Sequence, residues 1–493
     1  MQTRHSTPPL ICEVQTIHTP ESLVQQLART SGVTLLRSSL VDSQGRYSFV
    51  TASPFLTLRS FGSRCEIVST ETAHVQFGNP WHVLDGLMAR YELLDEIDLP
   101  FPLGGCFGYW GYDLKNFVEP KLPRRAVNDL ELPDCHVGFY DSLMVFDHHL
   151  GKTWIVSTGV QADGSRTERR ANERLTYWQH ILENPGKDEF HLVPDSFVER
   201  DAQITKDAAC AEPTSDNANL IPTAIASNLS RSEFIAKVAR AQNYIRAGDI
   251  YQVNLSHRLS AQWTGSAWEF FQTLCDLSPA PFSAYLDCGE FQIASSSPES
   301  FLRMSGSHIK TRPIKGTRPR SADPDRDTQL TYELQTSTKE QAELVMITDL
   351  LRNDLGKVCE FGSVQVPELM RLERYAHVQH LVSTVEGRLR PEMTHFAAFA
   401  SCFPGGSITG APKIRAMEII DELEPISRGP YTGAIGYLGF NRESQLSITI
   451  RTAVSKEGSI YFNVGAGIVA DSNPEAEYEE TLAKARGFLA ALE

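Results

Sequence analysis

A stretch rich in proline, serine, aspartate and asparagine interrupts the chain near its middle, at residues 191–228. Such a composition is typical of a linker or a long surface loop, because these residues favour turns over helices and strands. The chain of 493 residues is also too long for one simple hydrophobic core. The sequence therefore predicts an N-terminal region at 10–190, a linker at 191–228 and a second region at 229–493.

The first region is rich in expected strands. Residues 47–51, 56–61 and 143–146 are dominated by β-branched, aromatic and other apolar residues, and glycines bracket them as turns. After the linker, Ser232 can cap a helix whose apolar residues fall at helical spacing up to Gly248. The sequence thus predicts a mixture of strands and helices.

The overall composition restricts the class of protein and its partners. With 41% hydrophobic and 22% charged residues, and no run of about 20 apolar residues, the chain is expected to be a soluble cytoplasmic protein without a membrane span. Nine scattered cysteines without a C-x-x-C pair indicate reduced thiols. A net charge of −15 without a basic tail argues against nucleic acid and anionic membranes as partners.

Residues 104–108 match the Gly-x-Cys-x-Gly pattern of glutamine amidotransferases. Such an enzyme requires a histidine followed two residues later by an acid, and none of the 14 histidines has Asp or Glu at that offset. The aromatic residues that follow are typical of a buried strand, so we interpret Cys106 as a structural residue.

Lys315 stands out as a candidate nucleophile. A short strand is expected at 309–311, followed by a loop that contains Lys315, two prolines and a glycine. Arg312, Arg318 and Arg320 lie close by in sequence, and like charges together with partial burial favour a neutral, nucleophilic amine. The alternative is a basic, solvated hairpin.

Two acidic pairs suggest a metal site. Glu340 and Glu343 lie three apart in one expected helix, and Glu477 and Glu480 in another, which Asn473 is expected to cap. Residues three apart share a helix face, so each pair points two carboxylates the same way. Two such faces opposed would hold Mg²⁺; the alternative is a solvated acidic surface.

Other candidates also allow two interpretations. Lys484 lies four residues after Glu480, so it is either a surface partner of that glutamate or a ligand for a substrate carboxylate. Glu299 is either a general acid or a turn residue. His380 has apolar neighbours, which is typical of a core histidine. The glycine-rich segment 403–413 leads into an expected helix, whose N-terminus would suit an anion.

Five motifs together resemble the chorismate-utilising enzymes, in the order found in that family. They are Ser-Ser-Ser-Pro-Glu (295–299), Pro-Ile-Lys-Gly-Thr-Arg-Pro (313–319), Asp-Leu-Leu-Arg-Asn-Asp-Leu-Gly (349–356), Gly-Ser-Ile-Thr-Gly-Ala-Pro-Lys (406–413) and Gly-Ala-Gly-Ile-Val-Ala-Asp-Ser (465–472). The region 10–190 is similar to the N-terminal region of anthranilate and aminodeoxychorismate synthase large subunits. The resemblance implies an α+β fold, with large antiparallel β-sheets packed centrally and helices outside.

Within this family, two positions separate the activities. Isochorismate and salicylate synthases carry a water-activating lysine where this chain has Gln252. Anthranilate synthases usually have alanine where this chain has Lys315, whereas a lysine there is similar to the aminodeoxychorismate synthases, in which it is proposed to attack C2 of chorismate. The resemblance thus favours conversion of chorismate and ammonia to 4-amino-4-deoxychorismate, for 4-aminobenzoate and folate synthesis. The alternatives are an anthranilate synthase of the tryptophan pathway and a catalytically silent sensor of chorismate or tryptophan.

The resemblance also implies a role for each candidate residue. Lys315, Glu299 and His380 would be catalytic, and Glu343, Glu480, Glu340 and Glu477 would hold Mg²⁺. The expected contacts to chorismate come from Thr409, Tyr431, Arg451, Gly465, Lys484 and Thr317. Ammonia would come from a separate glutamine amidotransferase subunit. Ser38 would line a tryptophan pocket, although Arg37 stands where the family usually has glutamate.

Overall fold

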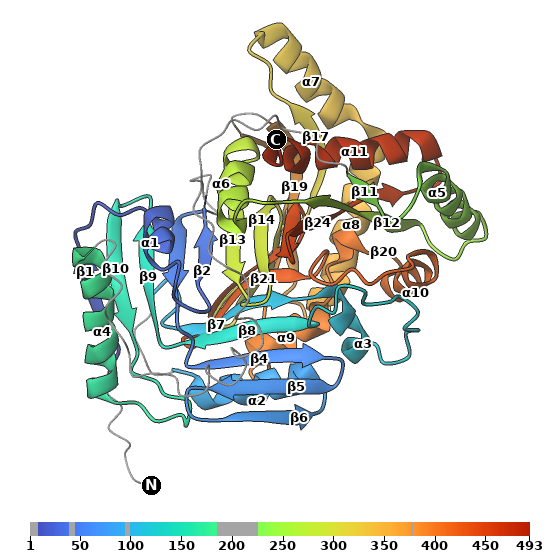
Figure 1. Ribbon diagram of the computed structural model, residues 1–493. Coiled ribbons are helices and arrows are strands. Elements are labelled where there is room, and N and C mark those ends of the chain that lie inside the picture. The colour runs from blue at the N-terminus through green and yellow to red at the C-terminus, as the bar shows by residue number, and fades with distance from the viewer. Residues whose placement is uncertain (1–7, 39–44, 94–98, 185–224, 376–377) are drawn as a thin grey trace.

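Two large antiparallel sheets form the centre of the molecule (Figure 1). The computed structural model describes residues 8–38, 45–93, 99–184, 225–375 and 378–493. Most of the predicted linker, 191–228, lies outside these residues. In spatial order, sheet A consists of β1 (Leu10–Val14), β10 (Lys152–Ser157), β9 (Ser142–Asp147), β3 (Tyr47–Thr51), β2 (Thr34–Arg37), β13 (Phe282–Asp287), β14 (Gln292–Ser297), β23 (Thr452–Lys456), β24 (Ser459–Ile468), β12 (Gln252–Gln262) and β11 (Ala226–Ser227), with β20 (Gly410–Ala411) beside β12.

Sheet B also has 12 strands. In spatial order it consists of β17 (Ile314–Pro319), β19 (Val378–Arg388), β16 (His308–Thr311), β15 (Ser300–Ser305), β22 (Glu443–Ile448), β21 (Ala434–Gly439), β7 (Gly105–Trp110), β8 (Cys135–Tyr140), β4 (Leu56–Phe61), β5 (Arg64–Ser69) and β6 (Ala73–Phe77), with β18 (Gln365–Arg374) beside β19. The three runs predicted as strands in the first region are confirmed as β3, β4 and part of β9.

The helices surround the two sheets. They are α1 (Pro20–Gln26), α2 (Pro80–Tyr91), α3 (Lys115–Val118), α4 (Glu168–Glu183), α5 (Arg231–Arg246), α6 (Ala267–Leu277), α7 (Pro324–Thr336), α8 (Thr338–Gly356), α9 (His395–Cys402), α10 (Lys413–Leu423) and α11 (Pro474–Ala491). Helix α7 projects from the top of the molecule (Figure 1). Within the described ranges, none of these helices is long and apolar enough to cross a bilayer.

Each sheet packs against helices on one face and against the other sheet on its opposite face. Side chains of α1, α4, α6 and α11 share one hydrophobic cluster with sheet A, and those of α2, α8 and α9 share another with sheet B. Residues alternate along β13: Tyr285 points to the helices, whereas Ala284 and Leu286 meet Tyr109 and Ile435 of sheet B. The predicted α+β fold with central antiparallel sheets is confirmed.

The two regions defined by sequence are not separate in space. Strand β2 from the first region pairs with β13 from the second in sheet A, and β7 pairs with β21 in sheet B. Cys106 lies within β7, fully buried, and burial raises the pKa of its thiol. A buried thiol with a raised pKa is unreactive, which agrees with a structural role.

Local capping explains where helix α5 begins. Its N-cap is Ser230, whose hydroxyl accepts from the N–H of Glu233, while the Glu233 carboxylate accepts from the N–H of Ser230. The prediction of Ser232 as the cap is therefore wrong, because only Ser230 has the glutamate partner three residues later that completes a capping box.

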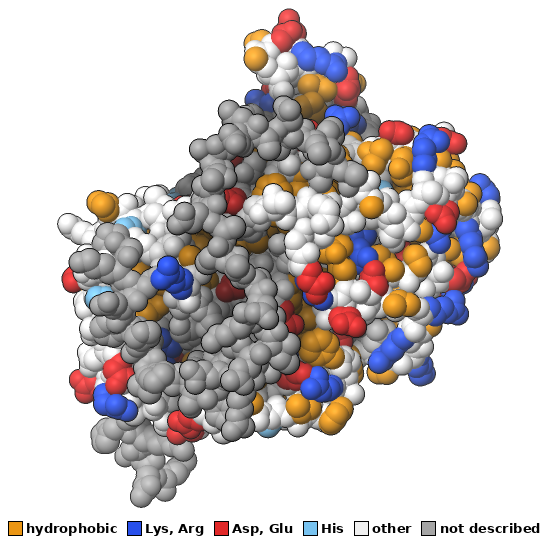
Figure 2. Space-filling model, viewed as in Figure 1, with side chains coloured by type: hydrophobic (Ala, Val, Ile, Leu, Met, Phe, Trp, Pro, Cys, Tyr) orange, Lys and Arg blue, Asp and Glu red, His pale blue; other side chains and the backbone are white. Residues whose placement is uncertain are grey.

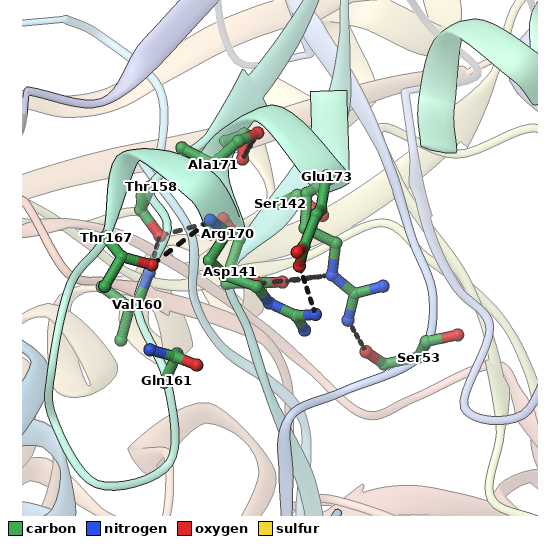
Figure 3. Close-up of polar contacts among 12 residues, drawn as sticks. Ser53, Asp141, Ser142, Thr158, Val160, Gln161, Thr167, Arg170, Ala171 and Glu173 are labelled. Atoms are coloured by element: carbon green, nitrogen blue, oxygen red, sulfur yellow. Dashed lines mark hydrogen bonds and ion pairs between the residues drawn. The ribbon is translucent and has the colours of Figure 1, made fainter. Parts of the chain in front are cut away.

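A buried ion pair fastens α4 to the turn between β8 and β9 (Figure 3). The carboxylate of Asp141 in this turn is 1% exposed and accepts from Arg170 Nε at 2.9 Å and from Arg174 Nε at 3.0 Å. Arg174 also donates to the Ser53 carbonyl at 2.8 Å. One carboxylate thus balances two arginines inside the protein, where an unpaired charge is costly.

We expect Asp141→Asn to lower the free energy of unfolding by about 3–5 kcal/mol, because it leaves the buried Arg174 without a counter-charge and leaves the partly buried Arg170 only Glu173, at 3.9 Å. The shift of the urea midpoint measures this loss. Arg169→Gln is the matched control on the same helix, since its side chain is 81% exposed, and it should change stability by less than about 0.5 kcal/mol. Equal shifts for the two variants would contradict a structural role for the Asp141 pair.

Candidate active site

Lys315 lies on the edge strand β17 of sheet B. The strand predicted before it is confirmed within β16, but the predicted loop is wrong, because the residues around Lys315 pair with β19. β17 ends one side of the sheet, and an edge position tolerates Pro319, which has no N–H to donate. A bulge separates Lys315 from Thr317, and Gly316 between them has φ +72°.

The positive charges near Lys315 are locally balanced. Each of the three neighbouring arginines is paired with a carboxylate: Arg312 with Glu373, Arg318 with Glu340 at 3.5 Å, and Arg320 with Asp327 at 2.9 Å. Lys315 Nζ itself lies 3.9 Å from Glu343 Oε2. The unbalanced cluster of like charges that the sequence suggested is therefore wrong, and a carboxylate lies near the amine instead.

Lys315 reaches from sheet B to two residues of sheet A. A Cβ placed on Gly467 in β24 would lie 4.0 Å from Lys315 Nζ and 2.7 Å from Gln252 Nε2. Gln252, the first residue of β12, is 1% exposed, and its Oε1 has no hydrogen-bond partner in the described structure. Glycine at 467 thus leaves space in which a primary amine and a buried amide face the same small volume.

The two acidic pairs lie on α8 and α11, one pair on each helix. Both helices were predicted, including the Asn473 cap of α11, and both are confirmed. Burial raises the pKa of Glu343; Lys315 and Lys339 oppose this shift, whereas Glu340 and Glu477 add to it. Glu477 of α11 therefore acts electrostatically on Glu343 of α8.

Other side chains hold these carboxylates in the structure. Glu477 Oε1 accepts from the Ser472 hydroxyl at 2.6 Å, and Glu480 pairs with Lys484 at 2.8 Å. Burial raises the pKa of Glu480, but Lys484, together with the charges of Lys339 and Lys315, outweighs that effect and the pKa is lowered. Across the described ranges, no three His, Cys, Asp or Glu side chains are close enough together to hold a metal ion.

Glu299 is buried between β14 and β15, with 8% of its surface exposed. Burial raises the pKa of its carboxyl, and this outweighs the opposite effects of a hydrogen bond with Ser407 and of the Lys315 charge. A carboxyl with a raised pKa keeps its proton to higher pH and can serve as a general acid. The turn interpretation is compatible with its backbone position but does not explain this burial.

His380 and Thr317 face each other across β19 and β17, with Thr317 Oγ1 2.9 Å from His380 Nδ1. Burial lowers the pKa of His380, and the charge of Arg451 lowers it further. His380 is therefore a neutral imidazole at pH 7. Arg451 has φ +49°, and its Nη1 donates to Ser278 Oγ at 3.3 Å.

Gly465 of β24 lies beside two other candidates, Tyr431 and Lys484. Lys484 Nζ donates to the Gly465 carbonyl at 2.9 Å, and a Cβ on Gly465 would lie 2.8 Å from the Tyr431 hydroxyl. Burial raises the pKa of Tyr431 to about 12, so its hydroxyl remains a donor. Thr409 is fully buried, and its hydroxyl donates to the Gly405 carbonyl at 2.9 Å.

A buried ion pair joins the segments that carry these residues. Arg428 and Glu424 meet at 2.7 Å, with side chains 1% and 6% exposed. Arg428 also donates to the carbonyls of Asn254 at 2.7 Å and Ile408 at 3.2 Å, and its guanidinium lies 5.7 Å from the centre of the Tyr431 ring. It therefore links β12, the segment before Thr409 and the loop that carries Tyr431.

Ser38 lies apart from this site, beside β2. Its side chain is buried, and its N–H donates to the Ser48 hydroxyl at 3.1 Å. A cavity of about 40 Å³ lies between the two sheets nearby, and its lining includes Arg37, Tyr47, Phe282 and Tyr437. Arg37 is paired with Glu21. The assignment of Ser38 to a tryptophan pocket stays a prediction.

Sequence reasoning named the candidate residues of the site, but it missed residues that support them. Ser407 stands in a glycine-rich motif that gives no sign of its hydrogen bond with Glu299, because that bond is a tertiary contact. Arg428 gave no signal beyond a glutamate four residues earlier, which is typical of an exposed helix pair.

Comparisons with known proteins show what this chain is similar to. The model of the chorismate binding enzyme family matches residues 46–490. The chain is 39% identical to anthranilate synthase component 1 of Acetivibrio thermocellus over 481 residues, covering 97% of this chain and 93% of that protein. It is also 39% identical to aminodeoxychorismate synthase component 1 of Escherichia coli K12 over 478 residues, covering 96% of each.

Solved structures show the same fold. Anthranilate synthase component I from Streptococcus pneumoniae TIGR4 superposes with a TM-score of 0.75 at 30% identity, covering 91% of this chain and 93% of that chain. The menaquinone-specific isochorismate synthase from Escherichia coli has a TM-score of 0.68 at 16% identity, covering 99% and 95%, which is a likeness in fold alone.

We expect Glu299→Gln to stabilise the folded protein at neutral pH. Above its ordinary pKa of 4.5, the unfolded chain releases this proton while the folded protein keeps it. Stability therefore falls as pH rises through the window up to the raised pKa. Because the variant cannot ionise at this position, its unfolding free energy should exceed that of the wild type above the window and match it below pH 4.

Urea unfolding between pH 4 and pH 8 measures this difference. Glu290→Gln, at an exposed turn where the side chain is 79% exposed, is the control and should stay within about 0.5 kcal/mol of the wild type at each pH. A Glu299→Gln variant that is less stable than the wild type at pH 8 would show that the ionised carboxylate is the favoured form.

Proposed function

The chain belongs to the chorismate binding enzyme family, and we propose that it converts chorismate and ammonia to 4-amino-4-deoxychorismate. Relatives named aminodeoxychorismate synthase and relatives named anthranilate synthase are equally similar to it, at 39% identity. Overall similarity therefore does not choose between the two reactions. The choice rests on one observation, the position of the Lys315 amine.

The surroundings of Lys315 support this role. A side chain on Gly467 would approach both the Lys315 amine and Gln252. Because glycine has no side chain, this space stays open. The Lys315 charge opposes the rise in the pKa of Glu299, so the Lys315 amine and the Glu299 carboxyl are near enough to interact. In such an arrangement the nucleophile can attack one ring carbon while the acid protonates the group that leaves from another.

The first step joins Lys315 to the substrate. The Lys315 amine, once it has given up its proton, adds to C2 of chorismate, and the two ring double bonds shift so that the C4–O bond breaks. Glu299 gives its proton to the departing hydroxyl, which leaves as water. Its raised pKa suits this task, because a carboxyl that is ionised at neutral pH has no proton to give.

The second step releases the lysine. Ammonia adds to C4, the double bonds shift back, and the C2–N bond breaks with its electron pair returning to the Lys315 amine. The Glu299 carboxylate takes the proton that the new amino group loses. The sum of both steps is exchange of a hydroxyl for an amino group at C4, with water as the other product.

Cationic and neutral donors would hold the dianionic substrate. Arg451 suits a carboxylate, because a guanidinium binds one through two parallel hydrogen bonds. The neutral His380, held by Thr317, and the un-ionised Tyr431 can donate to oxygen atoms without adding charge. Thr409 and Gly465 would contact the substrate from the sheet A side, together with Lys484, which already holds the Gly465 carbonyl.

The two acidic pairs fit Mg²⁺ in their chemistry. The pKa of Glu343 is raised by burial and by the charges of Glu340 and Glu477, although no three of these carboxylates are close enough together in this structure to hold a metal ion. Such repulsion is relieved by a hard cation with oxygen ligands. We propose that Glu343 and Glu480 hold Mg²⁺, with Glu340 and Glu477 acting through water. Bound Mg²⁺ would neutralise a substrate carboxylate.

Ammonia would come from a glutamine amidotransferase subunit. Both relatives are named component 1, which supports a second component. The one Gly-x-Cys-x-Gly segment of this chain places Cys106 inside β7, fully buried, where it cannot attack glutamine.

Incubation of the purified chain with chorismate, Mg²⁺ and ammonium tests the proposal. We expect a non-aromatic amino product that an aminodeoxychorismate lyase converts to 4-aminobenzoate. Lys315→Ala and Lys315→Arg should both lower kcat at least about 100-fold, because neither side chain can form the adduct.

Lys315→Arg separates covalent from electrostatic roles, since it keeps the positive charge. Activity retained in Lys315→Arg but lost in Lys315→Ala would mean that only the charge is needed. Anthranilate and pyruvate as products would assign the chain to the other branch of the family.

We expect Glu480→Gln to weaken Mg²⁺ binding about 10-fold or more, because it removes a charged oxygen ligand. Isothermal titration of MgCl₂ into the protein without chorismate measures this directly. Glu479→Gln is the matched control, since the neighbouring side chain is 63% exposed and 3.9 Å from Arg231. Equal affinities for the two variants would exclude Glu480 as a ligand.

A further inference from the structure

A second cavity, of about 230 Å³, lies between β15, β16, β18 and β22 on sheet B. Its lining contains four cationic side chains, Arg303, Lys310, Arg312 and Arg371, and two carboxylates, Glu368 and Glu373. The remaining lining residues, Ser300 and Gln445, are polar. None of the residues assigned above to catalysis, substrate or metal lines this cavity.

Two of the four cations are neutralised by the carboxylates. Arg312 pairs with Glu373 and lies 4.0 Å from Glu368, while Arg371 pairs with Glu368. Arg303 and Lys310 have no carboxylate within 4.0 Å among the described residues, and neither makes a side-chain hydrogen bond there. Four cations against two carboxylates give the lining a formal charge of +2.

The two unpaired cations lie directly opposite each other. In the β15–β16 hairpin, Arg303 is the cross-strand partner of Lys310, and both side chains are partly buried. Directly opposed like charges destabilise a sheet, whereas an opposed pair of unlike charges stabilises it. Burial lowers the pKa of Lys310, and Arg312 and Arg303 add to that shift. On its other side Lys310 is the cross-strand partner of Glu386, and the charges of Glu386 and Glu368 oppose this shift without cancelling it. The opposed like charges beside the open space are therefore only partly compensated.

We propose that this cavity binds a small polar dianion, with two carboxylates or one phosphate group. Its charge would balance the +2 of the lining, and Arg303 and Lys310 would each gain a charge-assisted hydrogen bond. The lining has hydroxyl, amide and charged groups but no apolar or aromatic side chain. A ligand that is polar over its whole surface is therefore favoured over an aromatic one.

The cavity is connected to the candidate active site through Arg312. This side chain donates to Thr384 at 3.2 Å and to Glu373, and Glu373 is the cross-strand partner of His380. Arg312 also precedes Lys315 by three residues on the chain that forms β17. An anion bound to Arg312 would therefore influence β17 and β19, the strands that carry Lys315 and His380.

Inorganic phosphate and succinate are the probes, each at constant ionic strength set with NaCl. We expect either probe, or both, to raise the thermal midpoint of the wild type in a saturable manner, and calorimetric titration to give one site. Lys310→Gln and Arg303→Gln should weaken binding about 10-fold or more, because each removes a charged donor. Binding of phosphate alone or of succinate alone identifies which group the site takes.

The unliganded variants supply a second readout. If Arg303 and Lys310 repel each other, Lys310→Gln without any probe should be at least as stable as the wild type. Arg388→Gln, at a side chain of β19 that is 67% exposed, is the control and should leave probe binding unchanged.

Three outcomes would overturn the proposal. The first is equal stabilisation of the wild type and both variants by the probes. The second is a loss of stability in unliganded Lys310→Gln, which would mark Lys310 as a structural cation. The third is a large rise in KM for chorismate in the same variant, which would place the cavity on the substrate's path rather than at a separate site.

Discussion

The buried pair of Arg428 and Glu424 is the interaction on which the candidate site depends. Two charges inside a protein are tolerated only when their hydrogen-bonding groups are satisfied, and here the guanidinium donates to Glu424, to two backbone carbonyls and to a hydroxyl. Glu424 also accepts from the N–H and hydroxyl of Ser256, whose cross-strand partner is Gly465. The site is therefore built from segments that a single ion pair holds in register.

Local patterns in the sequence predicted the parts of the site but not their assembly. A spacing of three residues was enough to place Glu340 with Glu343 and Glu477 with Glu480, because helix geometry is local. That α8 packs against β17 and β19 of sheet B, while α11 packs against β24 of sheet A, is decided by tertiary packing. The placement of the two acidic helices on different sheets follows from the sandwich of sheets, which only the family resemblance implied.

The failures also have physical causes. The prolines around Lys315 suggested a loop, but an edge strand lacks a neighbour on one side and accepts such residues. The prediction of Ser232 as the helix cap is wrong because Glu233 forms a capping box with Ser230 instead. The opposition of Arg303 and Lys310 depends on the register of one hairpin, closed by a turn in which Gly306 has φ +54°. Composition and charge spacing contain no signal for that register.

The sharing of both sheets between distant parts of the chain has a consequence for synthesis on the ribosome. Strand β7 is buried along its whole length, and its neighbour β21 is made more than 300 residues later. Until then the nascent chain exposes strand faces that have no partner. Contacts so far apart in sequence form slowly, because the intervening chain must be ordered first. The first half cannot finish folding while the second is being made, and chaperones that shield apolar strands would protect it during that interval.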